Sequence, residues 1–247
     1  MIEIKGLLKD FDGFNALKGL DLTVNKGSIY GLVGVNGSGK TTVIKHLAGV
    51  YRSDGGTIRV GGADVYDNAA VKAKMGYVSD DLYFFPSYNL KMLGKFFGGL
   101  YKNWNAARFQ ELIELMGLDV KRRVSRFSKG MQKQAALALS LSSMPEFLLL
   151  DEPIDGLDPI VRSRIFKWII DDVAARQMTV LISSHNLKEM DGICDTVGII
   201  KEGKMLMERD LDELKAEMSG NPAFTHQPPS LDEIFIHVYE SEEGKHV

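Results

Sequence analysis

The sequence is poor in cysteine and has no long hydrophobic run. Cys194 is the one cysteine among 247 residues, which excludes an internal disulfide and a multi-cysteine zinc or iron–sulfur site and fits a reducing cytosol. No stretch approaches the roughly 18–20 apolar residues that span a bilayer. Residues 1–6 lack the apolar core and cleavage site of a signal peptide. We therefore expect a cytoplasmic protein that relies on another chain for any membrane-spanning part.

A basic excess is also lacking. Lys plus Arg number 30 and Asp plus Glu number 33, which gives a formal net charge of -3. Proteins that bind nucleic acid usually carry a basic excess, so no nucleic-acid partner is expected. What is present is the composition of a globular protein, 45% hydrophobic and 26% charged, which is sufficient for a sizeable core.

Apolar segments of strand length alternate with helix-like segments along much of the chain. Residues 28–33, 147–150 and 179–183 are short apolar runs that precede polar or glycine-rich turns and helical patterns. This order predicts an α/β fold with a mostly parallel sheet covered on both faces. Two further strands are predicted at 2–8 and 20–24, with a turn over residues 10–15.

Residues 88–145 have helical periodicity. Leu112, Leu115 and Met116 recur at three- to four-residue spacing, and residues 135–141 are strong helix formers. We predict a helical insertion in the α/β core. Beyond Gly203 the pattern predicts a charged helix over 208–218, a turn region over 220–229 and a last helix over 230–239.

A glycine-rich motif follows the strand at 28–33. It reads Gly34-Val35-Asn36-Gly37-Ser38-Gly39-Lys40-Thr41 and fits G-x-x-x-x-G-K-[ST] in full. Glycines let successive N–H groups curl toward phosphate oxygens, and the following helix adds the positive end of its dipole. We predict a nucleoside triphosphate site in which Lys40 reaches the β- and γ-phosphates, Thr41 ligates Mg²⁺ and Thr42 adds a phosphate hydrogen bond.

Two acidic residues end the apolar strand at 147–150. Asp151 is suited to bind Mg²⁺ through water, and Glu152, which faces the other way, is suited to accept a proton from an attacking water. A simple strand cap is the alternative, and the phosphate loop in the same chain disfavours it. A GTPase would need a guanine-reading N-K-x-D, and residues 25–28, Asn-Lys-Gly-Ser, fail at the last position.

Residues 126–134 separate the classes of phosphate-loop protein. They read Arg-Phe-Ser-Lys-Gly-Met-Gln-Lys-Gln and resemble the LSGGQ signature of ATP-binding cassette (ABC) ATPases, with Met131 in place of glutamine. The resemblance extends over nearly the whole chain. In that family the signature completes the ATP site of the opposite subunit, which implies this role for the Ser128 hydroxyl and the Gly130 N–H at a helix start.

Other residues occupy positions of this family's motifs. The resemblance implies that Phe11 stacks on adenine, and a place in the core is the alternative. Residues 154–159 resemble the D-loop, in which Asp158 is also expected to cap a helix that starts with Pro159. His185 matches the switch histidine, which hydrogen-bonds the γ-phosphate and orients the water.

One position departs from the family's pattern. Asp80 stands where the family usually has a glutamine that contacts Mg²⁺ and water. A carboxylate can still ligate the metal, directly or through water, but it adds negative charge and loses about one methylene of reach. Just downstream, Tyr83, Phe84, Phe85 and Tyr88 either pack in the helical insertion or form a groove for a short helix of a membrane partner.

The resemblance implies a fold and an organisation. The fold is that of a P-loop NTPase (RecA-like), an α/β protein with a mostly parallel sheet, an N-terminal antiparallel β subdomain and an inserted α-helical subdomain. A single ABC ATPase domain would span residues 1–247. Its nucleotide-binding core would cover about 1–87 and 146–210, its helical subdomain about 88–145, and a short helical tail 211–247.

The resemblance also implies a function. The chain is expected to bind ATP and Mg²⁺, to pair head-to-tail with a second ATP-binding subunit, and to power export through a separate transmembrane permease at the inner face of the cell membrane. The S-K-G-M spelling, the single cassette and residues 229–235 indicate export. A soluble ABC ATPase outside transport and a weakly catalytic ATP-dependent clamp are the open alternatives.

Overall fold

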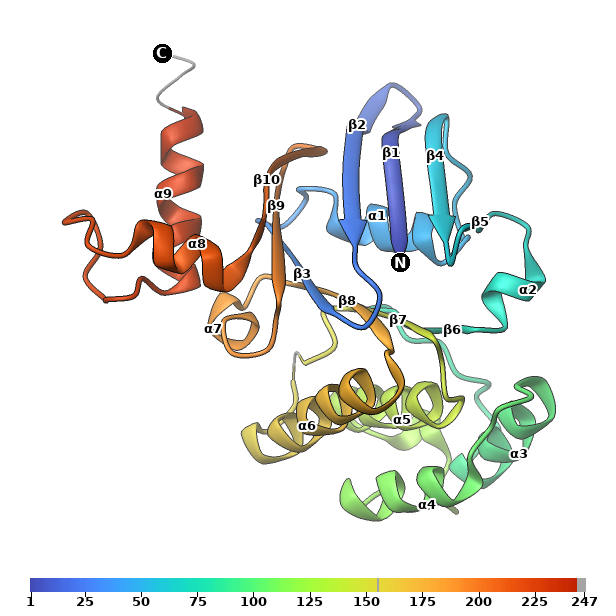
Figure 1. Ribbon diagram of the computed structural model, residues 1–247. Helices are drawn as coiled ribbons and strands as arrows, with labels where there is room; N and C mark the ends of the chain where they lie inside the picture. The colour runs from blue at the N-terminus through green and yellow to red at the C-terminus, as the bar shows by residue number, and fades with distance from the viewer. Residues whose placement is uncertain (155, 244–247) are drawn as a thin grey trace.

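The computed structural model describes residues 1–154 and 156–243. Its centre is a six-stranded sheet (Figure 1) whose strands, in spatial order, are β10 (Lys204–Asp210), β9 (Thr196–Lys201), β3 (Ile29–Val33), β8 (Thr179–Ser184), β7 (Phe147–Asp151) and β6 (Met75–Val78). The neighbours from β9 to β6 run parallel, and β10 runs antiparallel to β9. The predicted sheet is therefore parallel over most of its width.

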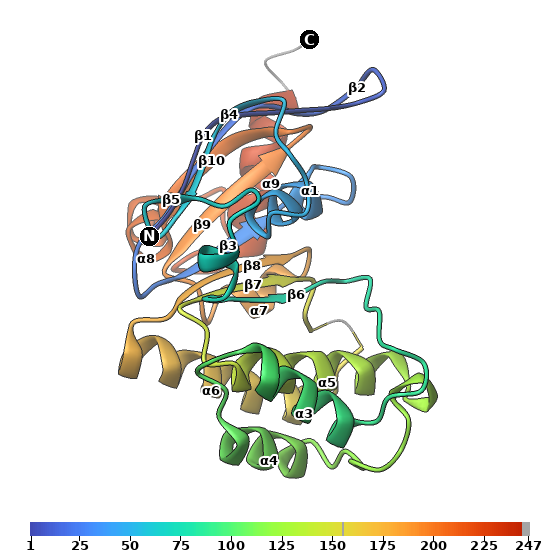
Figure 2. The same ribbon diagram turned by 90° about the vertical axis from the view of Figure 1, so that its right-hand side faces the viewer.

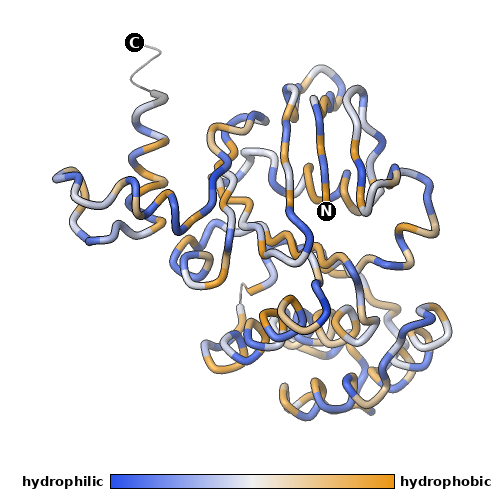
Figure 3. The backbone as a smooth tube through the Cα atoms, viewed as in Figure 1, coloured by the Kyte–Doolittle hydropathy of each residue, from blue (hydrophilic) through white to orange (hydrophobic). Residues whose placement is uncertain are grey.

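The central strands are apolar because both of their faces are covered. All residues of β3, β7 and β8 are buried. In β7, Leu148 and Leu150 belong to the hydrophobic core on one side of the sheet and Leu149 to the core on the other side. Hydrophobic colour follows these strands through the middle of the molecule (Figure 3). A strand that is buried on both faces reads as a continuous hydrophobic run, as this one does.

A second, antiparallel sheet lies above the first (Figure 1). In spatial order its strands are β2 (Phe14–Val24), β1 (Ile2–Phe11), β4 (Gly55–Val60) and β5 (Ala63–Asp64). Helix α1 (Lys40–Leu47) packs between the two sheets, against β2 and β4 on one side and β7 and β8 on the other. β1 and β2 are longer than predicted, and their turn is confined to Asp12 and Gly13, both with positive φ.

Helices α5 (Lys129–Ser142) and α6 (Pro159–Arg176) lie next to the opposite face of the central sheet (Figure 2), and α3 (Leu90–Leu100) and α4 (Ala106–Leu115) pack against α5 farther from it. A 3-10 turn, η1 (Val124–Arg126), precedes α5. The side chains of Asn89, Asn105, Ser128 and Asp158 cap these helices by accepting backbone N–H bonds. Two short helices, α2 (Ala69–Lys72) and α7 (Leu187–Met190), lie in connections. Among the described residues, no helix has the length and hydrophobicity needed to cross a bilayer.

The C-terminal part contains α8 (Leu211–Met218) and α9 (Leu231–Glu243). The helix predicted over 208–218 was placed too early, because Glu208, Arg209 and Asp210 belong to β10 and pair with β9. The Glu208 carboxylate also accepts the Thr23 N–H of β2 at 2.8 Å. Tertiary pairing thus overrides the helical propensity of this charged segment.

The double burial of β7 predicts the effect of one core substitution. Leu149→Ala removes a side chain that is fully buried between the sheet and α1, so we expect the free energy of unfolding to fall by about 2–5 kcal/mol in urea denaturation. Leu100→Ala is the matched control, because Leu100 is 61% exposed and its replacement should change stability by no more than about 0.5 kcal/mol. Equal effects of the two variants would contradict the packing described here.

Candidate functional site

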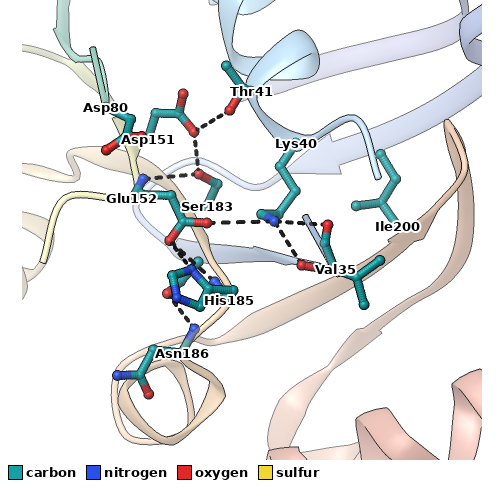
Figure 4. A network of polar contacts seen from close by, with 12 residues as sticks. Val35, Lys40, Thr41, Asp80, Asp151, Glu152, Ser183, His185, Asn186 and Ile200 are labelled. Atoms are coloured by element: carbon teal, nitrogen blue, oxygen red, sulfur yellow. Dashed lines mark hydrogen bonds and ion pairs between the residues drawn. The ribbon is translucent and has the colours of Figure 1, made fainter. Parts of the chain in front are cut away.

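The ends of four parallel strands bring the phosphate loop, the two acidic residues after β7, Asp80 and His185 to one edge of the sheet (Figure 4). In the register, Asp151 of β7 pairs with Ser183 of β8, and Val33 of β3 pairs with Ser184 of β8. The phosphate loop therefore follows β3 at the same edge at which Glu152 follows β7 and His185 follows β8. Asp80 comes two residues after β6, which is the neighbour of β7. Ligands of parallel α/β sheets bind at such carboxyl ends.

The phosphate loop is a tight curl with a buried lysine in it. Gly37 and Gly39 have φ values of 80° and 114°, which only glycine adopts readily. Lys40 is buried, and its Nζ donates to the main-chain carbonyls of Gly34 at 2.8 Å and Val35 at 3.3 Å. An ammonium group held across the loop in this way is placed to bind phosphate oxygens.

The remaining loop residues occupy positions that suit the predicted role. Ser38 is buried, and its Oγ has no hydrogen-bond partner among the described residues. Asn36 is exposed on the loop, and Thr42 lies half-buried on the first turn of α1. A buried hydroxyl without a partner is costly, so Ser38 is suited to hydrogen-bond a ligand in the loop.

Asp151 is the buried centre of a second set of contacts. Its Oδ1 accepts the hydroxyls of Thr41 at 3.1 Å and Ser183 at 2.7 Å (Figure 4). Its Oδ2 is buried and has no partner among the described residues. Burial raises the pKa of this carboxyl above its usual range, against the lowering effect of the Ser183 and Thr41 hydrogen bonds. Hard divalent cations bind oxygen ligands. The Asp151 oxygen that accepts no hydrogen bond and the neighbouring Thr41 hydroxyl are ligands of this kind.

Thr41 and Asp151, two of the three predicted metal ligands, are suited to contribute to a Mg²⁺ site. Within the described residues, no group of three or more His, Cys, Asp and Glu side chains could hold a metal alone. Thr41 and Asp151 would provide two protein oxygens, and the ion would take its other ligands from phosphate oxygens and water, which is the usual coordination of Mg²⁺ in triphosphate sites. The site is therefore suited to a metal that arrives with its nucleotide.

Glu152 joins the phosphate loop to His185. Its Oε1 lies 3.6 Å from Lys40 Nζ, and its Oε2 lies 2.9 Å from His185 Nδ1 and accepts the His185 N–H at 3.3 Å. The backbone of Glu152 is in the left-handed region with φ of 47°. A non-glycine residue there is strained, and such strain gathers at functional sites. The conformation turns the carboxylate toward the lysine and the histidine.

Asp80 has a partner that the sequence did not indicate. Its Oδ1 accepts a hydrogen bond from Lys133 Nζ of α5 at 3.0 Å, and the same Nζ donates to the Glu152 carbonyl at 2.6 Å. Ser183 was missed as well, although its place just before His185 at the end of a predicted strand was a usable signal. Lys133 lies 53 positions from Asp80, and no local pattern pairs them.

Three predicted residues, from the signature and the D-loop, lie outside this network. Ser128 accepts the Met131 N–H at 3.3 Å and caps α5, and Gly130 sits so close to the Gly156 carbonyl that a Cβ would lie 2.5 Å from its oxygen. Asp158 accepts the N–H groups of Ile160 and Val161 and caps α6 as predicted. The predicted D-loop also includes Asp155, which lies outside the described residues.

Phe11, the predicted adenine platform, lies at the end of β1 and is half-exposed. Its ring packs edge-on against Tyr51 with centroids 5.3 Å apart, and Lys9 Nζ lies 5.1 Å from its centroid. At 38% exposure the ring retains a free surface. This geometry is compatible with stacking on a base and does not match a fully buried core aromatic.

The aromatic cluster after Asp80 divides into two kinds of residue. Tyr83 and Phe85 are 80% and 47% exposed, whereas Phe84 and Tyr88 pack against the hydrophobic core. Tyr83 and Phe84 line a groove of about 330 Å³, together with residues of β6, α3 and α5, among them Phe97. Core packing thus applies to Phe84 and Tyr88, whereas docking of a membrane partner at Tyr83 stays a prediction.

The C-terminal helix α9 also reaches the phosphate loop. Tyr239 Oη donates to the Ile200 carbonyl at 2.8 Å and accepts the Val35 N–H at 3.4 Å. Val35 and Tyr239 are 204 positions apart. The sequence offered no sign that the helical tail lies beside the nucleotide site.

Comparison with known proteins gives the family. The family model described as ABC transporter matches residues 17–155, more than half of the chain. The chain belongs to the ABC transporter family. The ABC ATPase predicted from the signature and the phosphate loop is thereby confirmed.

Relatives of this ABC ATPase cover most of its length. The ABC transporter ATP-binding protein YtrB of Bacillus subtilis (strain 168) is 34% identical over 217 residues, 88% of this chain and 74% of that protein. The bacitracin transport ATP-binding protein BcrA of Enterococcus faecalis is 34% identical over 98% of this chain and 78% of its own. The daunorubicin/doxorubicin resistance ATP-binding protein DrrA of Streptomyces peucetius is 37% identical over 89% of this chain and 68% of its own.

Solved structures confirm the predicted fold class of the ABC ATPase. An ATP-binding subunit of an ABC transporter aligns with a TM-score of 0.86 and 23% identity over 97% of this chain and 99% of that chain. The dimeric cassette MJ0796, bound to ADP and phosphate, aligns with a TM-score of 0.76 and 20% identity over 85% of this chain and 99% of that chain. At these identities the likeness shows the fold.

The buried carboxylate of Asp151 predicts a pH-dependent effect. Its raised pKa means that the folded protein binds this proton more tightly than the unfolded chain does. The protonated carboxyl thus contributes stability that is fully present below the ordinary pKa of 3.8. This stability is lost as the pH rises through the raised pKa of the folded state. In the absence of Mg²⁺ and nucleotide, Asp151→Asn should therefore raise the Tm at pH 7.5 more than at pH 4.

The measurement is thermal unfolding at both pH values, with about 2–4 °C expected for each kcal/mol in a chain of this size. Addition of Mg²⁺ and ATP should reverse the order at pH 7.5, because the variant lacks the negative charge that the metal requires. A variant that is less stable than the wild type under all conditions would show that burial of the charge carries no penalty.

Proposed function

We propose that this ABC ATPase powers export of a substrate through a separate transmembrane permease. The contact of Glu152 with the buried Lys40 and the exposed His185, beside the phosphate loop, is the observation that supports a hydrolytic role most directly. The names of the relatives, which include drug resistance and bacitracin transport, support export over a soluble ABC ATPase outside transport. The permease would handle the cargo, so the residues of this site do not specify it.

The proposed chemistry is attack of water on the γ-phosphate of ATP. The N–H groups of the loop and the Lys40 ammonium would bind the triphosphate, with Lys40 exchanging its carbonyl partners for phosphate oxygens. Thr41 and Asp151 would hold Mg²⁺, which would supply positive charge to the phosphate oxygens. Glu152 would accept a proton from the water, and His185, held at 2.9 Å from the Glu152 carboxylate, would orient both the water and the γ-phosphate.

A second ATP-binding subunit would complete each site. Ser128 lies at the exposed start of α5 and makes no contact with the phosphate loop of its own chain among the described interactions. The Gly130 N–H lies on the first turn of the same helix, which is a favourable end for an anion. A head-to-tail pair would bring these groups to the partner's ATP, with Asp158 and the D-loop at the seam. Phe11 would stack on the adenine.

The permease would dock on the groove beside Tyr83. Exposed aromatic side chains around a groove are typical of protein contact surfaces. The groove lies next to the loop that carries Asp80, so an occupant could sense the nucleotide site through that loop. We place the subunit on the inner face of the cell membrane, held there by the permease.

We propose a separate role for each of the three parts of the chain. The core, residues 1–87 and 146–210, would hold the nucleotide; the helical part, 88–145, would present the signature and the groove; and the tail, 211–247, would brace the phosphate loop through Tyr239. The described part of the tail ends at residue 243.

Glu152→Gln tests the proposed catalytic base. The amide keeps the shape of the side chain but cannot take the proton, so kcat should fall by about 10²–10⁴. Binding of a fluorescent ATP analogue should remain within a few-fold of the wild type, because the phosphates are bound by the loop. Phosphate release and nucleotide titration measure the two effects, with Glu202→Gln, on the exposed turn between β9 and β10, as the control. Unchanged turnover would remove Glu152 from the mechanism.

Tyr83→Ala tests the docking surface. Loss of an exposed aromatic anchor should weaken binding of the detergent-solubilised permease by about 1–2 kcal/mol. The Tm of the isolated subunit should not change, because Tyr83 is 80% exposed. Tyr66→Ala, which removes a half-exposed tyrosine that does not line this groove, is the control for the binding assay. Equal permease binding by both variants would place the docking surface elsewhere.

A further inference from the structure

Lys133 is a buried cation that no part of the proposed chemistry uses. It lies on the second turn of α5, and its side chain is 8% exposed. Its ammonium contacts Asp80 after β6 and the main chain of Glu152 after β7. A lysine is rarely buried unless its charge is compensated.

The contact with Glu152 bears on backbone strain. Glu152 has φ of 47°, a conformation that a non-glycine residue keeps only when its surroundings enforce it. Two groups do so here. Ser183 accepts the Glu152 N–H, through Oγ at 3.2 Å and through its carbonyl at 3.2 Å, and Lys133 binds the Glu152 carbonyl at 2.6 Å. The peptide after Glu152 is thus held by a charge-assisted hydrogen bond, which is stronger than a neutral one.

The contact with Asp80 holds the lysine in place. Asp80 Oδ1 lies 3.0 Å from Lys133 Nζ, and the Asp80 side chain is 53% exposed. Loss of the lysine would leave this carboxylate free to hydrate, whereas loss of the aspartate would leave a buried ammonium with one carbonyl partner. The arrangement therefore favours a fixed ammonium position, with Asp80 as its counter-ion.

We infer that Lys133 is a positioning residue for hydrolysis: it holds Glu152 in its strained conformation through the main-chain carbonyl, and Asp80 acts through Lys133. The inference deepens the proposed function and rests on Glu152 as the base. It assigns Asp80 a role as the counter-ion of Lys133 and not as a direct ligand of Mg²⁺. It also makes α5, the helix that carries Ser128, a direct neighbour of the catalytic carboxylate's backbone.

Lys133→Met tests this role, because methionine keeps an unbranched apolar stem and removes the ammonium. Relaxation of Glu152 should lower kcat at least tenfold, while the KM for ATP stays within twofold, since Lys133 makes no contact with the phosphate loop among the described interactions. Lys167→Met, which removes an exposed lysine of α6, should keep full kcat. A Lys133→Met kcat within twofold of the wild type, or a KM that rises as much as kcat falls, would overturn the inference.

A double-mutant comparison tests the order of action. Asp80→Asn should lower kcat less than Lys133→Met does, because the amide oxygen still accepts from the ammonium. The double variant should be no slower than Lys133→Met alone, since both changes act through one contact. Multiplied effects would show that Asp80 acts independently, for example on the metal, and would overturn its assignment as a counter-ion.

Two further variants deal with a possible folding failure of Lys133→Met and separate the role of Lys133 from that of Glu152. If Lys133→Met does not give folded protein, as judged by Tm and by binding of a fluorescent ATP analogue, Lys133→Gln replaces it, because its amide ends short of the Glu152 carbonyl and the same loss of kcat is expected. Glu152→Gln separates the two hypotheses: full turnover in that variant refutes Glu152 as the base, whereas a slow Glu152→Gln beside a fast Lys133→Met refutes only the role of Lys133.

Discussion

The parallel register of β3, β8, β7 and β6 is the constraint on which the site depends. Parallel strands point their carboxyl ends in one direction, so the residues that follow each strand meet at one edge. The pairing of Asp151 with Ser183 places two polar side chains side by side at the last rung. A shift by one residue would turn every side chain of a strand to the other face and would separate Asp151 from Thr41. The apolar bodies of these strands, buried on both faces, keep the register in place.

The same edge concentrates buried charge, and the structure compensates each group in a different way. Lys40 is held by main-chain carbonyls and by Glu152, and Asp151 by two hydroxyls. One oxygen of Asp151 remains without a partner in the described part of the chain. Buried polar groups without partners are unfavourable, so this oxygen is suited to bind a metal ion or a hydrogen-bond donor of a ligand. Stability and readiness to bind are thus opposed at this residue.

Helix α5 joins the signature, the buried Lys133 and the hydrophobic core. Its first residues form the signature, its second turn carries Lys133, and its apolar face packs in the core with the helices around it. The cap residue Ser128 and the lysine that binds the Glu152 carbonyl thus lie about one helical turn apart on the same helix. The loop of Asp80 and Tyr83 joins that helix to the groove in which we place the permease.

Local motifs were readable from the sequence because their chemistry resides in adjacent residues. The phosphate loop, the Asp151-Glu152 pair and the signature each lie within ten positions, and the β–α alternation around them predicted the fold class that the solved structures confirm. Local propensity misled where pairing competed with it, as for Glu208, Arg209 and Asp210, which extend β10. For the aromatic cluster, the sequence showed which residues are aromatic but not which of them are exposed.

By itself, then, the sequence determined the family, the fold class and the residue types that can bind a triphosphate, since glycine spacing, a lysine and two acids in order suffice for that chemistry. Tertiary structure alone decided which side chains meet. It brought Lys133 to Asp80 across 53 positions and Tyr239 to Val35 across 204. The physical reason is that such contacts depend on how helices pack onto the sheet, and packing sums many weak, distant interactions that no short stretch of sequence records.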